Sequence, residues 1–263
     1  MTGYLMEDSR EAQRLADKVD PEAWVRRYLV PLDLNNKRIL DVGCGPAVIA
    51  AELGRQFETA TVVGIDASPQ RIEAAHANIV DAPNVSVQIG DAHALPFEDE
   101  SFDFVVCRFL MEYLPDKALA VQEMKRVLKP GGRLFLQDLD GQLVWHYPID
   151  QSLQDGVEKA LKLLEKSGFD PMVGRKLFHL CHAAGFESLD VNIDPYHLIA
   201  GPIDAENLAL WKTKLEIATQ NLTNMPEFKD TAAAISQRFL NYLDRDDSLT
   251  YSVLFSVLAT KPR

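Results

Sequence analysis

The stretch ILDVGCGPA, residues 39–47, is an apolar run that ends in an acid and two glycines. Such a run followed by glycines is typical of a buried strand that turns sharply into a helix. The dinucleotide-binding pattern G-x-G-x-x-G needs a third glycine where Val48 stands. The stretch instead fits D-x-G-x-G-x-(G/A), in which Asp41 orients the loop while Gly43 and Gly45 let backbone amides approach a ligand.

Strand and helix patterns alternate around this loop. The predicted strands are Arg38–Val42, Ala60–Ile65, Val85–Ile89, Phe102–Cys107, Arg133–Gln137, Ser188–Ile193 and Leu249–Ala259. The predicted helices are Ser9–Val19, Pro21–Val30, Val48–Phe57, Ser68–Ile79, Asp116–Leu128, Gln151–Ser167 and Gly174–Ala184, with a mostly helical stretch from Ala205 to Leu243. This alternation predicts an α/β fold, Rossmann-like and doubly wound, with a mostly parallel sheet and helical lid insertions.

The chain is expected to form a single domain of four parts. A helical cap spans residues 1–36, a ligand-binding core 37–140, substrate-side helices and the sixth strand 141–247, and a final strand 248–263. The long helical excursion after the fifth strand predicts either a substrate lid or an oligomer interface.

Composition narrows the class of protein. The 263 residues carry a formal net charge of -12 and three cysteines without a CxxC pair, so a disulfide framework and a nucleic-acid partner are not expected. The sequence has no signal-peptide pattern and no apolar run long enough to span a membrane. We expect a soluble, cytoplasmic protein without a membrane partner, and no metal site, because His179 and His182 lack a second pair of ligands nearby.

Two further acids follow predicted strands. Asp66 lies 23 residues after Gly43, close to the offset of about 20 at which an acid meets a ribose hydroxyl in this architecture. The alternative is that Asp66 only caps the following helix. The third turn, Gly90-Asp91-Ala92, repeats the pattern. An edge that gathers Asp41, Asp66 and Asp91 would repel a pyrophosphate and favour a cationic adenosine such as S-adenosylmethionine.

Four segments in this order carry a resemblance to a known family: ILDVGCGPA, VVGIDASPQRIEAA, VQIGDAHALPFEDESFDFVVCRFLMEYLPD and EMKRVLKPGGRLFLQD. The sequence resembles the class I S-adenosylmethionine-dependent methyltransferases, in particular the small-molecule group that includes the ubiquinone and menaquinone enzymes. LTYSVLFSVLATKP resembles the last strand of that family. The resemblance implies a seven-stranded sheet whose last strand is antiparallel, and S-adenosyl-L-methionine as cofactor.

The resemblance also implies a set of cofactor-binding residues. In the family pattern, Gly43 and Gly45 pass close to the methionine part of the cofactor, Asp66 binds its ribose, and Asp91 with Ala92 binds its adenine. Arg14 is the expected partner of the methionine carboxylate, with a solvent-facing position as the alternative. The complete expected set is Tyr4, Arg14, Asp41, Gly43, Gly45, Asp66, Ala67, Gly90, Asp91, Ala92 and Arg108.

The expected function is transfer of a methyl group to the N, O or C atom of a small-molecule acceptor by in-line displacement. His146 is the candidate general base, and Trp145 or Tyr147 could stack on the acceptor or simply pack a lid helix. The alternatives are a non-methylating S-adenosylmethionine-dependent enzyme, such as a cyclase, and a cofactor-binding scaffold protein. Tyr196 and Trp211, in possible lid segments, favour an aromatic or amine-bearing acceptor.

Overall fold

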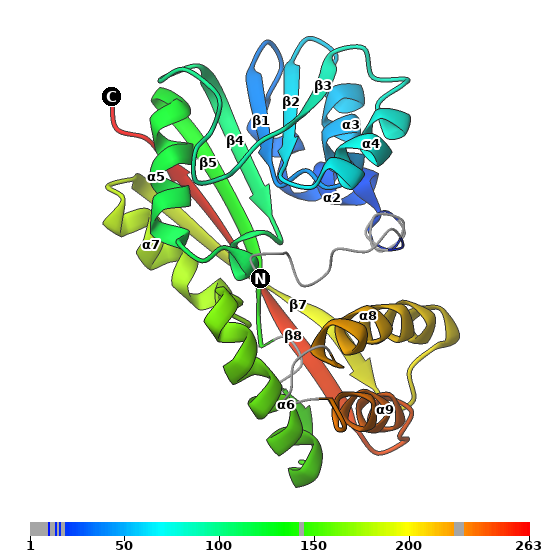
Figure 1. Ribbon diagram of the computed structural model, residues 1–263. Helices are drawn as coiled ribbons and strands as arrows, with labels where there is room; N and C mark the ends of the chain where they lie inside the picture. The colour runs from blue at the N-terminus through cyan, green and yellow to red at the C-terminus, as the bar shows by residue number, and fades with distance from the viewer. Residues whose placement is uncertain (1–9, 11–13, 15, 17–18, 142–144, 224–228) are drawn as a thin grey trace.

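The computed structural model describes residues 10, 14 and 16 and the ranges 19–141, 145–223 and 229–263 (Figure 1). The strands are β1 (Arg38–Val42), β2 (Thr61–Asp66), β3 (Val85–Ile89), β4 (Phe102–Arg108), β5 (Leu128–Asp140), β6 (His146–Tyr147), β7 (Glu187–Ala200) and β8 (Leu249–Thr260). The α-helices are α2 (Pro21–Tyr28), α3 (Val48–Gln56), α4 (Pro69–Asn78), α5 (Lys117–Val127), α6 (Gln151–Leu164), α7 (Leu177–Ala183), α8 (Ala205–Thr223) and α9 (Ala232–Leu243). The 3-10 helices of the described ranges are η1 (Val30–Leu32), η2 (Met111–Tyr113), η3 (Glu165–Ser167) and η4 (Gly174–Lys176).

The strands form one sheet in the order β3-β2-β1-β4-β5-β8-β6, and β7 pairs with β8. Neighbours among β1 to β5 are parallel, whereas β8 is antiparallel to β5. The predicted Rossmann-like α/β fold and antiparallel last strand are confirmed, and the two-residue β6 is an addition. The strand order reverses between β1 and β4, and ligands of such sheets bind beyond the carboxyl ends of the strands at this switch point.

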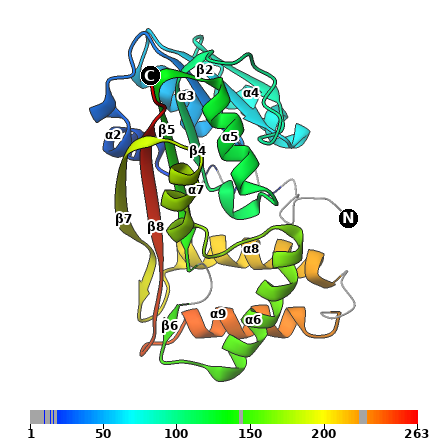
Figure 2. The same cartoon turned by 90° about the vertical axis from the view of Figure 1, so that its left-hand side faces the viewer.

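Successive residues of β1 pack on opposite faces of the sheet, as the period of two in a strand requires. Ile39 joins the apolar cluster formed with α2, α3 and α4, which includes Trp24 and Leu53. Leu40 joins the cluster on the other face, formed with α5 and α7, which includes Met124 and Cys181. The two sets of helices therefore cover the two faces of the sheet (Figure 2).

Side-chain caps begin several of the helices at the predicted positions. Ser68 accepts a hydrogen bond from the backbone of Arg71 at the start of α4, with Pro69 in the first turn. Asp116 and Asp150 cap α5 and α6 in the same way. Such caps satisfy backbone N–H groups that have no partner within the helix. Helix α3 has no side-chain cap, and the glycine loop leads directly into it.

A second group of helices lies beyond the main body of the sheet. We define the helical lobe as α6, α8, α9 and β6, with the ends of β7 and β8 that reach them (Figure 1). Its own apolar core contains Leu153, Val157, Ile203, Trp211, Leu215, Phe239, Tyr242 and Leu243. Strand β8 pairs with β6 at its start and with β5 farther along, so it connects the sheet to the lobe.

Strand β7 has 14 residues, more than twice the length of the predicted strand Ser188–Ile193. Its pairing with β8 is irregular. The register shifts between Tyr196 and Ile199, which marks a β-bulge. His197, inside this shift, has φ +47°, a left-handed conformation that side chains other than glycine rarely adopt. Beyond the bulge, Ile199 and Ala200 pair with β8 again, in the part of β7 that reaches the helical lobe.

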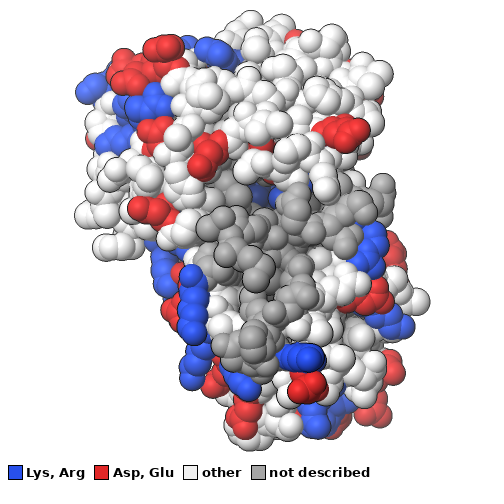
Figure 3. Space-filling view, viewed as in Figure 1, with Lys and Arg blue, Asp and Glu red and all other residues white. Residues whose placement is uncertain are grey.

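The described helices include no membrane span, and neither charge dominates the face shown in Figure 3. None of the helices in the described part of the chain combines the length and apolar character needed to cross a membrane. On the face shown in Figure 3, acidic and basic side chains are interspersed, with large uncharged areas between them.

Candidate active site

The glycine loop folds back across the end of the neighbouring strand. The backbone N–H groups of Gly43 and Cys44 both donate to the carbonyl of Ile65, at 2.8 and 2.9 Å. Gly43 has φ +74°, and a Cβ atom placed on it would lie 2.8 Å from Cδ2 of Leu110. A side chain at this position would therefore be strained and would collide, so the turn requires glycine.

Asp66, at the end of β2, fixes this loop. Its Oδ2 accepts a hydrogen bond from the N–H of Gly45 at 3.0 Å, and its Oδ1 accepts one from Ser68 at 2.9 Å. Nη1 of Arg71 lies 3.7 Å from Oδ1. The carboxylate thus joins the glycine loop to the start of α4. Ser68, and not Asp66, is the capping residue, and each Asp66 oxygen has a second lone pair for a ligand.

Asp41 lies on β1 immediately before the loop and is buried. Burial raises the pKa of Asp41 to about 7; the nearby Arg108 opposes this shift and Asp66 adds to it. A bound cation would favour the charged form of this carboxyl group.

Arg108, at the end of β4, lies in a cage of aromatic and amide groups. Its Nε donates to Oε1 of Gln137 at 3.3 Å, and its guanidinium lies 4.1 Å from the ring centre of Phe109 and 5.4 Å from that of Trp24. The indole N–H of Trp24 donates to the same Gln137 oxygen at 2.7 Å, and Gln137 donates to Ser256 at 2.8 Å. The carboxyl-terminal parts of β4 and β5 and the middle of β8 are thereby connected to helix α2.

The third predicted turn is held by its own side chains. Oδ1 of Asp91 accepts hydrogen bonds from the backbone and the ring of His93, at 2.8 and 2.9 Å, which hold the pKa of Asp91 below its usual range. The Asp91 side chain is exposed, whereas Ala92 is buried and Gly90 donates to the carbonyl of Asp66 at 3.1 Å.

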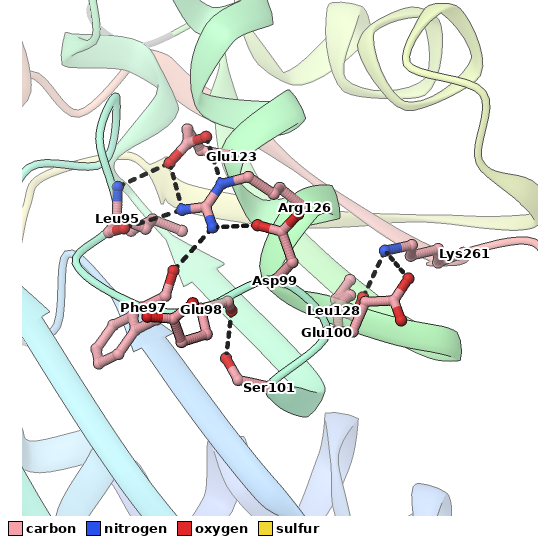
Figure 4. A network of polar contacts seen from close by, with 10 residues as sticks. All are labelled: Leu95, Phe97, Glu98, Asp99, Glu100, Ser101, Glu123, Arg126, Leu128 and Lys261. Atoms are coloured by element: carbon pink, nitrogen blue, oxygen red, sulfur yellow. Dashed lines mark hydrogen bonds and ion pairs between the residues drawn. The ribbon is translucent and has the colours of Figure 1, made fainter.

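An arginine on α5 anchors the segment that follows this turn (Figure 4). Arg126 donates to the carbonyls of Leu95 and Phe97 at 2.9 and 2.8 Å, and to Asp99 at 2.7 Å. Glu123 pairs with Arg126 and also accepts from the N–H of Leu95 at 2.9 Å. The connection between β3 and β4 is therefore bound to α5 along much of its length.

A cavity of about 90 Å³ lies over the glycine loop, at the switch point of the sheet. We call it the glycine-loop cavity. From the predicted set, its lining includes Arg14, Asp41, Gly43, Gly45, Asp66 and Arg108. Ala67, Gly90, Asp91 and Ala92 do not line it as the described residues outline it, and Tyr4 lies outside those residues.

Three charged residues of this cavity were not predicted. Arg71 of α4, Glu112 of η2 and Lys214 of α8 all line it. With Arg14 and Arg108 they make the site a mixture of acids and cations. Glu112 is buried, and an acid inside the apolar run FLMEYL was the sequence signal that could have identified it.

A second cavity, of about 300 Å³, lies between the bulge of β7 and helix α8. We call it the β7 cavity. Its lining includes Tyr196 and His197 from the bulge, and Asn207 and Trp211 from α8. Arg14 and Lys214 line both cavities, which therefore adjoin at these two residues.

His146 lies in the helical lobe. Its backbone pairs with Thr250, and its ring lies 5.1 Å from that of Tyr242 and 5.9 Å from that of Phe239. Burial lowers the pKa of His146. The two cavities outlined by the described residues are not lined by His146, and its role as a base stays a prediction.

Residues 40–136 match the model of a protein family described as "Methyltransferase domain". A ubiquinone biosynthesis O-methyltransferase of Neisseria meningitidis is 32% identical over 177 residues, which cover 64% of this chain and 71% of that protein. A demethylmenaquinone methyltransferase of Staphylococcus saprophyticus is 29% identical over 184 residues, or 65% and 79% of the two chains.

Among solved structures, a Bacillus halodurans protein assigned to the methyltransferases has the same fold. It covers 93% of this chain and 99% of its own, with a TM-score of 0.60 and 22% sequence identity. The family match, residues 40–136, includes the glycine loop and Asp66. The chain belongs to the class I S-adenosylmethionine-dependent methyltransferases.

Proposed function

We propose that the chain transfers the methyl group of S-adenosylmethionine to a small-molecule acceptor, with the cofactor in the glycine-loop cavity and the acceptor in the β7 cavity. The observation that carries this proposal is that the two cavities adjoin at Arg14 and Lys214 beside the switch point of the sheet. When bound, S-adenosylmethionine supplies a methyl group on a positively charged sulfur, which an acceptor atom displaces.

The residues of the glycine-loop cavity suit this cofactor. Gly43 leaves no room for a side chain and brings the backbone close to a ligand. Asp66 offers lone pairs to the ribose hydroxyls from an oxygen pair already oriented by Gly45 and Ser68. Asp41 offers a carboxylate to the cationic part, and Arg14 a guanidinium to the methionine carboxylate.

The turn at Gly90–Ala92 is proposed to hold the adenine. Asp91 accepts the hydrogen bonds from the backbone and ring of His93 through Oδ1, and its side chain is exposed. Ala67 precedes α4 on the same edge of the sheet. Contacts by Ala67, Gly90, Asp91 and Ala92 with the adenosine are predictions from the family pattern.

Positioning is the main contribution that the protein itself makes to such a displacement, because holding the acceptor atom about 3 Å from the methyl carbon supplies much of the rate acceleration. The β7 cavity holds the acceptor against Tyr196 and Trp211. The acceptor loses its proton as the new bond to carbon forms. His146 is the base predicted from the sequence, although it does not line either cavity as the described residues outline them.

Calorimetric titration of the protein with S-adenosylmethionine tests the cofactor site, and no heat of binding at millimolar cofactor contradicts it. Incubation with a metabolite extract and methyl-labelled cofactor then tests the reaction. We expect S-adenosylhomocysteine and a labelled product in equal amounts. Binding without S-adenosylhomocysteine would indicate a scaffold protein, and a changed metabolite without it would indicate a non-methylating enzyme.

A further inference from the structure

We infer that a second copy of this chain packs on an uncovered apolar face at the end of the sheet formed by β7 and β8, so that the protein is a twofold-symmetric dimer. We call this face the apolar stripe and define it by Tyr147, Val191, Ile193, Leu249 and Tyr251. The inference goes beyond the proposed function and does not depend on it. It is drawn from the register of the strands, the exposure of these side chains and the charge around them.

The register of the strands places the whole stripe on one face of the sheet. Val191 and Ile193 of β7 pair with odd-numbered residues of β8, and Tyr147 of β6 pairs with Leu249. Paired residues of neighbouring strands point to the same face, and side chains alternate between faces along each strand. The stripe therefore lies on the face that α5 and α7 cover, because the odd-numbered Val257 belongs to their apolar cluster.

The helices cover only part of this face. Ala259, near the end of β8, is buried in the cluster formed with α5 and α7. Leu249 and Tyr251, near the start of the same strand, are exposed. The exposed fractions of Ile193 and Tyr147 are 60% and 72%. In Figure 2 no helix is drawn in front of β7 or β8, so this part of the sheet faces outward.

The size of the stripe is that of the core of an interface. The exposed parts of its five side chains amount to several hundred Å², and the largest apolar patch on a typical monomer, about 300–600 Å², is often functional. A standard interface takes about 800 Å² from each partner and has an apolar core inside a polar rim. The stripe supplies such a core, and the side chains around it supply the rim.

The stripe carries no charge, although the chain as a whole carries -12. On this face of the described strands, the residues from Val191 to Pro195 of β7 and those of β8 are all uncharged. Asp194 lies on the opposite face, where it pairs with Arg27 and accepts a hydrogen bond from Tyr28 of α2 at 2.8 Å. Two copies of an acidic chain repel each other, so they associate best where no like charges meet. The stripe meets that condition with itself.

The free edge of β7 is protected from pairing with another strand, whereas the stripe beside it is uncovered. Strand β7 lies at the end of the sheet and pairs only with β8 among the described strands. Pro195 lacks an N–H group, the bulge after Tyr196 interrupts the edge, and Asp190 and Asp194 would meet like charges in a second β7. Proline, bulges and charged side chains keep edge strands from pairing. A partner of this region therefore packs on the face of the sheet.

A second copy suits this face better than a lipid surface does. The net charge of the chain is negative, and anionic lipid headgroups repel such a protein. Twofold dimers are the commonest oligomers, and each uses the same patch on both subunits. Two apolar sheet faces pack at about 10 Å with their side chains interdigitated, as in a β-sandwich. We therefore expect the two stripes to pack on each other.

Sedimentation equilibrium of the full chain tests the inference. The mass of one chain is 29.4 kDa. We expect twice this mass at micromolar concentration, and Ile193→Lys and Tyr147→Lys should each weaken the dimer at least tenfold. The matched control is Ile89→Lys, because Ile89 is exposed on β3 at the opposite edge of the sheet and should leave the dimer intact.

Three outcomes overturn the inference. The first is a monomer at every concentration, including a monomer that sediments with phosphatidylcholine vesicles and thus uses the stripe on lipid. The second is a dimer that Ile193→Lys leaves unchanged. The third is a dimer weakened by Ile193→Lys but not by Tyr147→Lys, which indicates pairing at the edge of β7, because β8 separates Tyr147 from that edge.

Cross-linking tests the same face without introducing a charge. The native cysteines Cys44, Cys107 and Cys181 are all buried, so a single exposed cysteine can be labelled selectively. Ile193→Cys or Leu249→Cys should give a linked dimer with a bismaleimide that spans about 10 Å, the distance between packed sheets. Ile89→Cys should give none. A dimer in sedimentation that neither stripe cysteine links has its interface elsewhere, and this result also overturns the inference.

Discussion

The two adjoining cavities are built in different ways. The glycine-loop cavity lies where parallel strands end, and most of its residues lie at the ends of β1, β2 and β4 or in the segments that follow these strands. The β7 cavity needs a bulge in one long strand and a helix, α8, that packs with the separate core of the helical lobe. The glycine-loop cavity is lined by both acids and cations, whereas the described charged residues that line the β7 cavity are all cations. One region is thus set by local turns and the other by long-range packing.

The largest expected effect separates the two regions through their cores. Phe239 of α9 is buried in the helical lobe, 5.2 Å from Trp211 between ring centres, and does not line the β7 cavity. Phe239→Ala leaves a cavity in this core and should destabilise it by about 3–5 kcal/mol. We expect cofactor affinity to change little and methylation of the acceptor in extracts to be lost. Urea unfolding measures the stability, calorimetry the cofactor affinity, and the labelled-cofactor assay the methylation.

Phe178→Ala is the matched control, because Phe178 is an exposed residue of α7. It should alter the free energy of unfolding only slightly. Equal loss of cofactor and acceptor binding in Phe239→Ala would show that the lobe and the glycine-loop cavity do not behave as separate regions.

This difference explains what could be predicted from the sequence. The alternation of strand and helix predicts the sheet, and Asp66 and Gly43 are recognisable because each directly follows a buried strand. Lys214 lies 171 residues after Gly43, in a helix whose own sequence does not reveal that it approaches the glycine loop. The bulge at His197 depends on pairing with β8, so no local pattern indicates it.

The second effect concerns the connection between β3 and β4. Arg126→Met removes the charged hydrogen bonds to Leu95, Phe97 and Asp99 and should cost about 1.5–3 kcal/mol of stability. We expect a fall in cofactor affinity as well, since this segment follows the turn proposed to hold the adenine. Thermal unfolding and calorimetry provide the two numbers.

Arg245→Met serves as its control, because the Arg245 pair with Asp247 is exposed and such pairs contribute little to stability. A stability loss in Arg126→Met with no change in cofactor affinity would confine the role of Arg126 to the fold.

A third, smaller effect tests the glycine-loop cavity directly. Asp66→Ala removes the acceptor of the hydrogen bonds from Gly45 and Ser68 and should weaken S-adenosylmethionine binding by about 1–3 kcal/mol. Asp81→Ala, at an exposed position beyond α4, should leave the affinity unchanged. Should calorimetry give the same affinity for Asp66→Ala and the unmodified protein, Asp66 has only a structural role.

The smallest expected effect on cofactor affinity is a pH dependence that only the glycine-loop cavity should show. Burial raises the pKa of Asp41 to about 7, above its unfolded value of about 3.9, so the folded protein holds the proton more tightly between these values. The contribution of Asp41 to the stability of the ligand-free protein, measured as the difference from Asp41→Asn, should therefore fall as the pH rises from about 4 to 7 and then level off.

Cofactor binding should respond to Asp41 with the opposite sign. A bound cation favours the carboxylate, so affinity should rise with pH around 7, by at most about tenfold per pH unit because one proton is released. The amino group of the cofactor also titrates, with a pKa of about 8. Because it titrates equally with the unmodified protein and with Asp41→Asn, the difference in pH dependence between the two proteins reports on Asp41. Calorimetry in buffers of different ionisation enthalpy counts the released protons. The same count in both proteins would exclude Asp41 as their source.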